Sequence, residues 1–212
     1  MNIEWDRHYE TARSELFFPD ENLVRLLNKY LRERGNADLT AADIGCGSGR
    51  HVKLCSDLGI KTVLAMDISH RGLLTCKKNF GSCPVQNDNR ALPLKEHSLD
   101  MAIAWGSLHY ATKEDFTLMI AEIRRTLKER GRMFATLRSS RDTHLKKGTN
   151  LGNNTWVTDL SDIKGSVVSF YDEDEVRAAL SAFSSFRLGL IERTIMGDLG
   201  QVLSHWVIDA EK

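Results

Sequence analysis

Apolar residues occur along this chain in two patterns that alternate. Short, almost continuous apolar runs, typical of buried strands, occupy residues 39–44, 62–66, 84–86, 99–104 and 133–137. Between several of these runs, apolar side chains recur every three or four residues, which predicts helices over 48–58, 69–79 and 112–129. Strands that alternate with helices in this way form a parallel sheet covered on both faces. The pattern therefore predicts an α/β fold, with ligands at the carboxyl ends of the strands.

Other segments extend this prediction at both ends. A helix is expected between Asp20, a good N-cap, and Gly35, which suits a helix C-terminus. Residues 139–169 are polar and lack periodicity, and a structureless run of that length in a compact domain is usually a functional loop or lid. The chain is predicted to end in a helix and two antiparallel strands, at 172–183, 186–196 and 202–208.

Composition narrows the class of protein. With 212 residues, 42% of them hydrophobic, the chain is expected to form a single domain with a full core. Its 29 basic and 29 acidic residues cancel, so we expect no nucleic-acid or membrane partner. No apolar run is long enough to span a bilayer, and Met1–Asp6 lacks the features of a signal peptide. Four cysteines without CxxC spacing indicate reduced thiols, so we expect a cytoplasmic protein without a metal site.

Three glycines follow the first predicted strand, in the stretch Asp43-Ile44-Gly45-Cys46-Gly47-Ser48-Gly49-Arg50. Glycines at alternate positions let the backbone turn sharply and let a ligand lie against bare main chain. A dinucleotide site would need G-x-G-x-x-G, but Arg50 holds the sixth position, and no phosphate-binding G-x-x-x-x-G-K-[ST] is present. Asp43, just before the turn, disfavours a pyrophosphate and suits an ammonium group.

Two more carboxylates follow predicted strands at the same edge. Asp67 ends the second strand, 22 residues after Gly45, where a carboxylate can accept hydrogen bonds from both ribose hydroxyls. Asp88 follows the third strand. The alternative is that these side chains only cap neighbouring helices. Three carboxylates at consecutive strand ends favour a shared ligand instead.

Several segments together match one known pattern. Asp43–Gly49 reads D-x-G-x-G-x-G, Met66–Ser69 carries an acidic loop, and further matches lie at Asp88–Leu94, Ser98–Ala104, Leu108–Tyr110 and Leu127–Met133. In these segments the chain resembles the class I, Rossmann-like, S-adenosylmethionine-dependent methyltransferases. It departs from that family at Asn89 and Arg130, where alanine and proline are usual.

The resemblance implies a three-layer αβα sandwich around a mostly parallel, seven-stranded, Rossmann-like sheet with an antiparallel C-terminal strand. It implies S-adenosyl-L-methionine as cofactor and S-adenosyl-L-homocysteine as product. The expected parts are a helical cap at 1–38, a cofactor-binding core at 39–138, a substrate loop at 139–169, and a helix with a strand pair at 170–212. The residues expected at the cofactor are Asp43, Gly45, Cys46, Gly47, Gly49, Arg50, Asp67, Ile68, Asp88, Asn89, Arg90, Ala104 and Trp105.

The methyl acceptor is expected beside the loop after the fourth strand. His109 is a candidate general base, because its ordinary pKa is near neutrality, although this position is commonly structural in the family. Tyr110 is a candidate for a catalytic or substrate-lining role. The other expected substrate-binding residues are Arg138, Arg141, Trp156 and Tyr9. Each of them has an ordinary structural alternative, such as a solvated charge or a packed aromatic ring.

The acceptor class is inferred from motifs that the chain lacks. After the fourth strand there is neither an N-P-P-[YF] element nor a cysteine, which disfavours methylation of bases, glutamine side chains and pyrimidine carbons. We therefore expect transfer to an O or N atom of a small-molecule acceptor by a monomer or homodimer. The alternatives are a protein or tRNA methyltransferase and a non-catalytic module that binds the cofactor. An NAD-linked oxidoreductase is disfavoured by Asp43 and Arg50.

Overall fold

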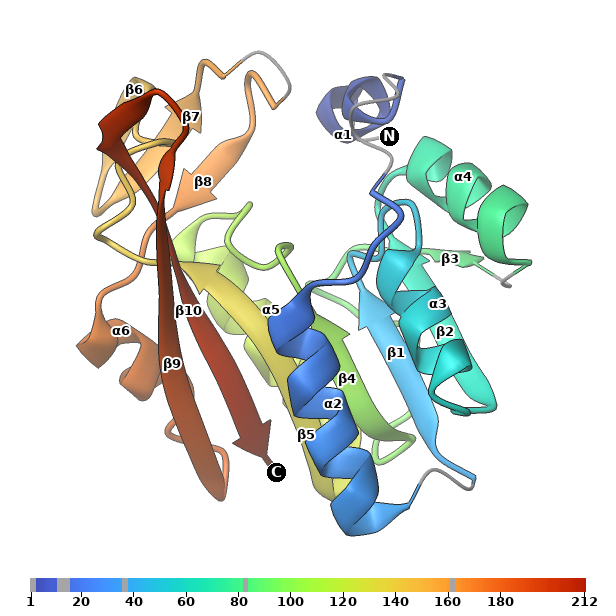
Figure 1. The fold of residues 1–212 in the computed structure, drawn as a ribbon. Helices are drawn as coiled ribbons and strands as arrows, with labels where there is room; N and C mark the ends of the chain where they lie inside the picture. Colours follow the sequence, from blue (N-terminus) through green and yellow to red (C-terminus); the bar gives the residue numbers. More distant parts are fainter. Residues whose placement is uncertain (1–2, 11–15, 36–37, 82–83, 161–162) are drawn as a thin grey trace.

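A computed structural model describes residues 3–10, 16–35, 38–81, 84–160 and 163–212. Its centre is a seven-stranded sheet in the order β3-β2-β1-β4-β5-β10-β9 (Figure 1). The strands are β1 (Thr40–Ile44), β2 (Thr62–Asp67), β3 (Pro84–Gln86), β4 (Leu99–Ala104), β5 (Leu127–Arg138), β9 (Ser185–Ile195) and β10 (Asp198–Glu211). The first five run parallel, and β10 is antiparallel to both β5 and β9. The predicted α/β fold, including the antiparallel C-terminal strand, is confirmed.

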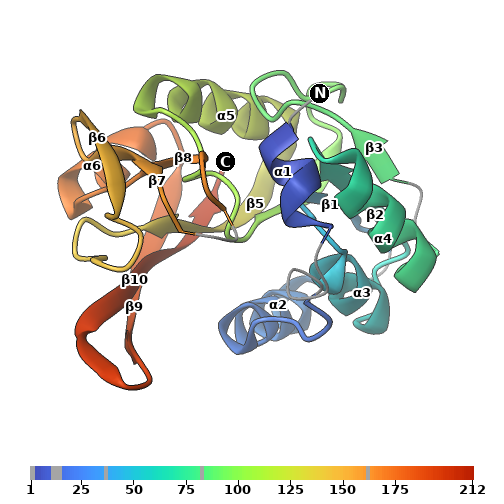
Figure 2. The ribbon, with the colours of Figure 1, turned by 90° about the horizontal axis from the view of Figure 1, so that it is seen from above.

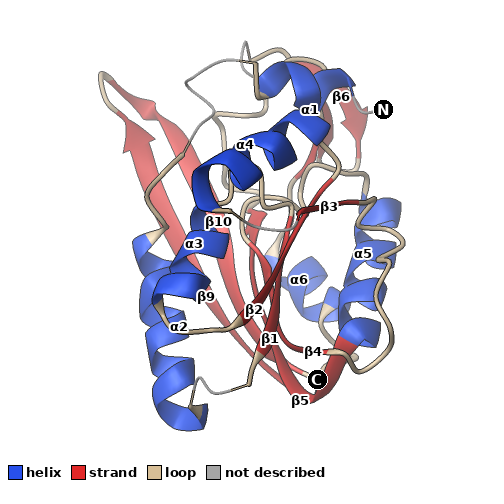
Figure 3. Cartoon of the chain, turned by 90° about the vertical axis from the view of Figure 1, so that its right-hand side faces the viewer, coloured by secondary structure: helices blue, strands red, loops and turns tan. Residues whose placement is uncertain are grey.

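Helices cover both faces of the sheet, which gives three layers (Figures 2 and 3). The helices are α1 (Ile3–His8), α2 (Glu21–Arg34), α3 (Arg50–Asp57), α4 (His70–Phe80), α5 (Lys113–Thr126) and α6 (Glu173–Ala179). Apolar side chains of α5 and α6 form one core with β1, β4 and β5, and those of α2 and α3 form another on the opposite face. None of the helices in the described part of the chain has the length and hydropathy to cross a bilayer.

Side chains at the helix starts explain where several helices begin. Asp20 accepts the backbone N–H of Asn22, and Ser69 accepts that of Gly72, at the first turns of α2 and α4. Asp172 forms a full capping box with Glu175 at α6. These bonds satisfy N–H groups that have no partner within the helix. The Ser69 cap also fixes the turn from β2 to α4, which lies at the carboxyl edge of the sheet.

The expectation of a structureless run at 139–169 was wrong. This segment contains a second, antiparallel sheet of β6 (Gly148–Gly152), β7 (Thr155–Thr158) and β8 (Val167–Ser169). Asn153 and Asn154 both adopt positive φ angles, which asparagine tolerates in tight hairpin turns. Leu145, Val168 and Phe170 form the small core beneath this sheet.

Two helix ends also differ from the prediction. Helix α5 ends at Thr126 instead of continuing to residue 129, because Leu127 already pairs with Leu99 in the sheet. A register shift follows, with Arg130 at φ +61°, so this stretch forms an irregular start of β5. Helix α6 ends at Ala179, short of residue 183.

Three of the four cysteines lie within the described residues. Cys46, Cys55 and Cys76 are buried and form no disulfide with one another. Cys83 lies outside the described residues.

Candidate active site

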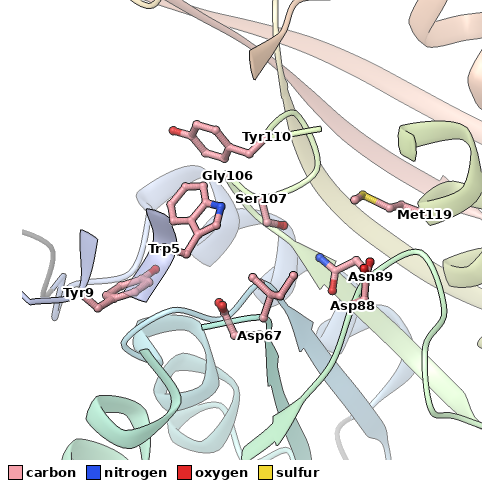
Figure 4. A pocket seen from close by; sticks show the side chains of 11 residues that line it. Trp5, Tyr9, Asp67, Asp88, Asn89, Gly106, Ser107, Tyr110 and Met119 are labelled. Carbon is pink, nitrogen blue, oxygen red and sulfur yellow. The ribbon is translucent and has the colours of Figure 1, made fainter. Parts of the chain in front are cut away.

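Two connected cavities lie at the carboxyl edge of the sheet. The first, here called the Asp67 cavity, has a volume of about 110 Å³ (Figure 4). It is lined by Trp5, Tyr9, Gly45, Asp67, Ile68, Asp88, Asn89, Gly106, Ser107, Tyr110 and Met119. The second, the Arg138 cavity, has a volume of about 450 Å³ and shares the walls formed by Trp5, Tyr9, Gly45, Gly106 and Tyr110. Because these five residues line both, the two cavities lie next to each other.

The glycine-rich turn after β1 forms the floor between the two cavities. Gly45 and Gly47 adopt φ angles of +77° and +52°, which disfavour any other residue. A Cβ atom on Gly45 would lie 2.3 Å from the Cβ of Ser107, and one on Gly47 would lie 2.2 Å from the hydroxyl of Tyr9. Ser107 donates a 2.7 Å hydrogen bond to the carbonyl of Ile44, which joins the β4 loop to β1. The turn therefore depends on bare main chain at these positions.

Asp67 holds this turn and also faces the cavity. Its Oδ2 accepts the N–H of Gly47 at 2.8 Å, and its Oδ1 accepts the N–H of Ser69 at 2.8 Å. Burial raises the pKa of this carboxyl, and the backbone N–H groups oppose that shift. Each carboxylate oxygen retains acceptor capacity. The side chain can thus receive hydroxyl donors from a ribose placed in the cavity.

Asp43 lies below the turn rather than on the cavity wall. Its side chain is buried, and Oδ2 has no hydrogen-bond partner among the described residues. Burial raises its pKa to about 8. A cation bound above the turn would favour the ionised form of this carboxyl.

Asp43 predicts a pH dependence of stability for the ligand-free protein. Its folded pKa of about 8 exceeds the ordinary aspartate pKa of 3.8, so the folded state holds the proton over that interval. Its contribution to stability is therefore full below about pH 4 and is lost as the pH rises to about 8. We expect Asp43→Asn, which cannot ionise, to become progressively more stable relative to wild type over this range. Urea unfolding at several pH values measures the difference, and a constant difference would contradict the assignment.

Asp88 and Asn89 also line the Asp67 cavity (Figure 4). However, the Asp88 carboxylate is engaged by its neighbour Arg90, whose Nε donates to both oxygens at 3.0 Å. Arg90 also reaches Asp115 at 3.2 Å. This pairing lowers the pKa of Asp88. Arg90 thus positions Asp88 and borders a neighbouring cavity of about 260 Å³ instead of the Asp67 cavity.

The N-terminal helix α1 covers the cavities with aromatic rings. Asp6 accepts hydrogen bonds from the Ser69 hydroxyl at 2.7 Å and the Arg71 N–H at 3.2 Å, which ties α1 to the start of α4. Trp5 then meets Tyr110 edge-to-face, with ring centroids 4.7 Å apart (Figure 4). Trp5 was not among the predicted binding residues. The aromatic residues near the N-terminus were the available signal.

His109 lies away from both cavities. Its side chain is only 1% exposed and is packed between Tyr110 and His205, with ring centroids 4.4 Å and 6.1 Å away. Burial, together with the charge of Arg138, lowers its pKa well below the usual value. The structure therefore gives no support to a general-base role for His109, because its ring is buried and lines neither cavity. Tyr110, in contrast, lines both cavities.

The other residues predicted to bind a ligand fall into two groups, those that line a cavity and those that do not. Cys46, Gly47, Arg50, Trp105 and Arg138 line the Arg138 cavity, and Ile68 lines the Asp67 cavity. The residues that line neither cavity are Gly49, Ala104, Arg141 and Trp156.

Each residue of the second group has a structural explanation. A Cβ atom on Gly49 would lie 2.4 Å from the sulfur of Cys76, so this glycine allows α4 to pack closely. Ala104 is fully buried in β4. Arg141 pairs with Glu192 at 2.9 Å on the surface, and Trp156 packs against the small core beneath β6–β8. The expected ligand roles of these residues therefore lack support from the structure.

The sequence also missed residues that complete the Arg138 cavity. His51, on α3, lines it, and burial lowers the pKa of this imidazole to about 3. Arg193 and Leu203 come from the C-terminal hairpin, and Leu145, Leu160 and Ile163 come from the segment around the small sheet. No local motif marks them, because only the tertiary fold brings these segments to the glycine turn.

Comparisons with known proteins agree with this geometry. Residues 42–135 match the family model described as "Methyltransferase domain". No curated protein sequence matches the chain. Among solved structures, an S-adenosylmethionine-dependent methyltransferase from Methanosarcina mazei has a TM-score of 0.67 at 18% identity, covering 88% of this chain and 96% of that one.

Two further structures extend the similarity. An S-adenosylmethionine-dependent methyltransferase from Archaeoglobus fulgidus has a TM-score of 0.66 at 14% identity, covering 99% of both chains. A possible histamine N-methyltransferase from Thermotoga maritima has a TM-score of 0.58 at 19% identity, covering 90% of this chain and 98% of that one. At these identities the neighbours establish the shared fold.

S-adenosylmethionine also fits the residues that are present. The Asp67 carboxylate retains acceptor sites for a ribose, the glycine turn leaves main chain accessible, and the buried Asp43 oxygen lacks a partner below the turn. Solved proteins with the same fold include S-adenosylmethionine-dependent methyltransferases. Residues 42–135 therefore match a methyltransferase domain, and the chain shares the fold of solved S-adenosylmethionine-dependent methyltransferases.

Proposed function

We propose that this enzyme transfers the methyl group to an O or N atom of a small-molecule acceptor that binds in the Arg138 cavity. The observation that carries the proposal is the volume of this cavity, about 450 Å³, which lies within the range of small-molecule sites. The cavity begins at the glycine turn, where the methionine part of the cofactor would lie, and continues to Arg138 and Leu203. An acceptor in the outer part would thus face the methyl group.

Proposed roles follow for the parts of the chain. The segment 1–38 acts as a cap through Trp5 and Tyr9, and residues 39–138 hold the cofactor through Gly45 and Asp67. The segment 139–169 forms the acceptor wall on one side. Residues 170–212 contribute the other side through the C-terminal hairpin.

Methyl transfer requires that the acceptor atom is aligned with the methyl group and that water is excluded. Bound S-adenosylmethionine supplies a methyl group that is already activated by the sulfonium charge. Trp5 and Tyr110 cover the junction of the two cavities and keep water from it. The outer walls orient the acceptor, so that its nucleophilic atom approaches in line.

A transfer assay on cell extract tests the acceptor class. The extract is separated by ultrafiltration into small molecules and macromolecules, and each fraction is incubated with the enzyme and methyl-tritiated S-adenosylmethionine. We expect label to enter the small-molecule fraction. Ultrafiltration after the reaction and nuclease or protease digestion of the large fraction identify where the label resides.

The outcomes separate the competing functions. Label only in a nuclease- or protease-sensitive product would contradict the proposal in favour of a tRNA or protein acceptor. Tight binding of S-adenosylhomocysteine without transfer to either fraction would favour a non-catalytic module. The Gly45→Ala variant is a suitable negative control, because it changes the floor of both cavities.

A further inference from the structure

Two arginines reach the Arg138 cavity from strands on either side of β10. Arg138 ends β5 and pairs with His205 of β10, while Arg193 of β9 pairs with Leu203 of β10. Residues directly opposite each other share a face of the sheet, as do residues two positions apart along a strand. Arg138 and Arg193 therefore project from the same face, and both line the cavity.

The charges around this cavity have one sign. Its lining contains Arg50, Arg138 and Arg193 and no aspartate or glutamate among the described residues. Arg50 lies beside the glycine turn, near the carboxylates of Asp20 and Asp43. Arg193 forms no ion pair with another described residue. Of the two arginines on this face, Arg138 is paired with Asp142, whereas the guanidinium of Arg193 is paired with no described carboxylate.

Arg138 is held in place but still has unused donors. Its side chain is nine-tenths buried, and Nη1 donates to Asp142 at 2.7 Å. Asp142 is itself fixed by the N–H groups of Leu145 and Ser204, both at 3.0 Å. The Arg138 Nε atom is buried and has no acceptor among the described residues. A buried guanidinium with an unmet donor is costly, and an acceptor supplied by a ligand offsets that cost.

Apolar side chains line the same cavity. They are Leu145, Leu160, Ile163 and Leu203. His144, the other polar group here, is already hydrogen-bonded through Nδ1 to Gln201 at 3.1 Å. The cavity thus combines guanidinium groups with an apolar surface, which suits a ligand that has an oxyanion at one end of an apolar body.

We propose that the methyl acceptor carries an oxyanion, either a carboxylate or a phosphate, on an apolar body, and that Arg138 and Arg193 bind this oxyanion. This inference rests on the proposed small-molecule function and names its substrate class. Arg193 is the more accessible guanidinium, because it is exposed and lacks the buried partner that Arg138 has. A cationic amine would instead face like charges without a carboxylate on the cavity wall.

Binding of matched aromatic probes to the enzyme saturated with S-adenosylhomocysteine tests this proposal. Benzoate and phenyl phosphate carry the two oxyanions, and benzylamine has a similar apolar body with a positive charge. We expect calorimetric titration to detect at least one of the anions and to find benzylamine at least tenfold weaker. Comparison of the affinities for benzoate and phenyl phosphate then distinguishes a carboxylate from a phosphate ligand.

The Arg193→Met variant tests whether Arg193 binds the anion. Removing this charge should weaken binding of the anion at least tenfold and leave the affinity for S-adenosylhomocysteine unchanged. Arg25→Met is the matched control, because Arg25 is exposed on α2 and pairs with Glu21 of the same helix. Arg138 is a less suitable target, because its removal leaves Asp142 buried without its partner.

The possible results are distinguishable. Equal binding of benzylamine, no detectable binding of either anion, or unchanged anion binding in Arg193→Met would each overturn this inference. In the transfer assay, anion-exchange chromatography of the labelled small molecules gives a second readout, and we expect the label among the anions. Label in neutral or cationic small molecules would overturn the oxyanion proposal alone, whereas label only in macromolecules would overturn the proposed function.

Discussion

Gly45→Ala is expected to destabilise the protein and to impair cofactor binding more than other single changes in the glycine turn. The new methyl group would lie 2.3 Å from the Cβ of Ser107, whose hydroxyl is bonded to the carbonyl of Ile44. Either Ser107 moves away from β1 or the turn opens. Overpacking of this kind costs about 1–3 kcal/mol, in addition to about 1–2 kcal/mol for a left-handed alanine. Affinity for S-adenosylhomocysteine should fall at least about tenfold, equivalent to about 1.4 kcal/mol.

Gly35→Ala provides the matched control for this change. Gly35 has a φ of +81°, close to the +77° of Gly45, but no described atom lies within 4 Å of its hypothetical Cβ. It should therefore show only the backbone cost and keep normal cofactor affinity. Urea unfolding and calorimetric titration measure both quantities. Equal loss of stability in the two variants, with unchanged affinity in Gly45→Ala, would contradict the close contact with Ser107.

The residues at the carboxyl edge of the central sheet could be predicted from local sequence patterns. Buried strands such as Thr62–Asp67 are almost continuous apolar runs, so their carboxyl ends are visible in the sequence. The glycines after β1 mark a turn without ambiguity. Right-handed crossovers then bring Gly45 and Asp67 to the carboxyl edge of the sheet. In the structure both residues line the Asp67 cavity.

The small sheet could not be predicted in the same way. Residues 148–152 of β6 are all exposed, so this strand has no apolar face to create a period of two. Its partner β7 is stabilised by Trp156 and by a core with Val168 and Phe170. These contacts join segments that have no common local pattern. The sequence of this segment therefore resembles that of a loop, although its backbone forms paired strands.

Side-chain direction explains the remaining differences at the site. His109 and Tyr110 are adjacent, yet only Tyr110 lines the cavities. Arg138 and Arg141 are three residues apart, and only Arg138 remains inside, because Asp142 binds its guanidinium while Glu192 binds Arg141. Composition and spacing carry no information about such partners. Arg193 was missed because its strand reaches the site only through pairing with β10.

Asp67→Ala should cause the second large loss of cofactor affinity. The carboxylate fixes the N–H of Gly47 at 2.8 Å and faces the cavity where the ribose is expected. Removing a charged acceptor from such a site costs about 1–3 kcal/mol. Asp57→Ala is the control, because Asp57 is exposed and pairs with Lys53 at 2.6 Å near the far end of α3. Asp67→Asn, which keeps one acceptor oxygen, should lose less stability and still bind more weakly.

Calorimetric titration of wild type and Asp67→Ala with S-adenosylhomocysteine and NAD tests the central claim most directly. We expect S-adenosylhomocysteine to bind wild type, to bind folded Asp67→Ala about 5–150-fold more weakly, and NAD to bind neither protein. The carboxylate at the end of β2 would then be a cofactor ligand at the edge of the sheet. Equal affinity of S-adenosylhomocysteine for the two folded proteins, or binding of NAD in its place, would contradict the account.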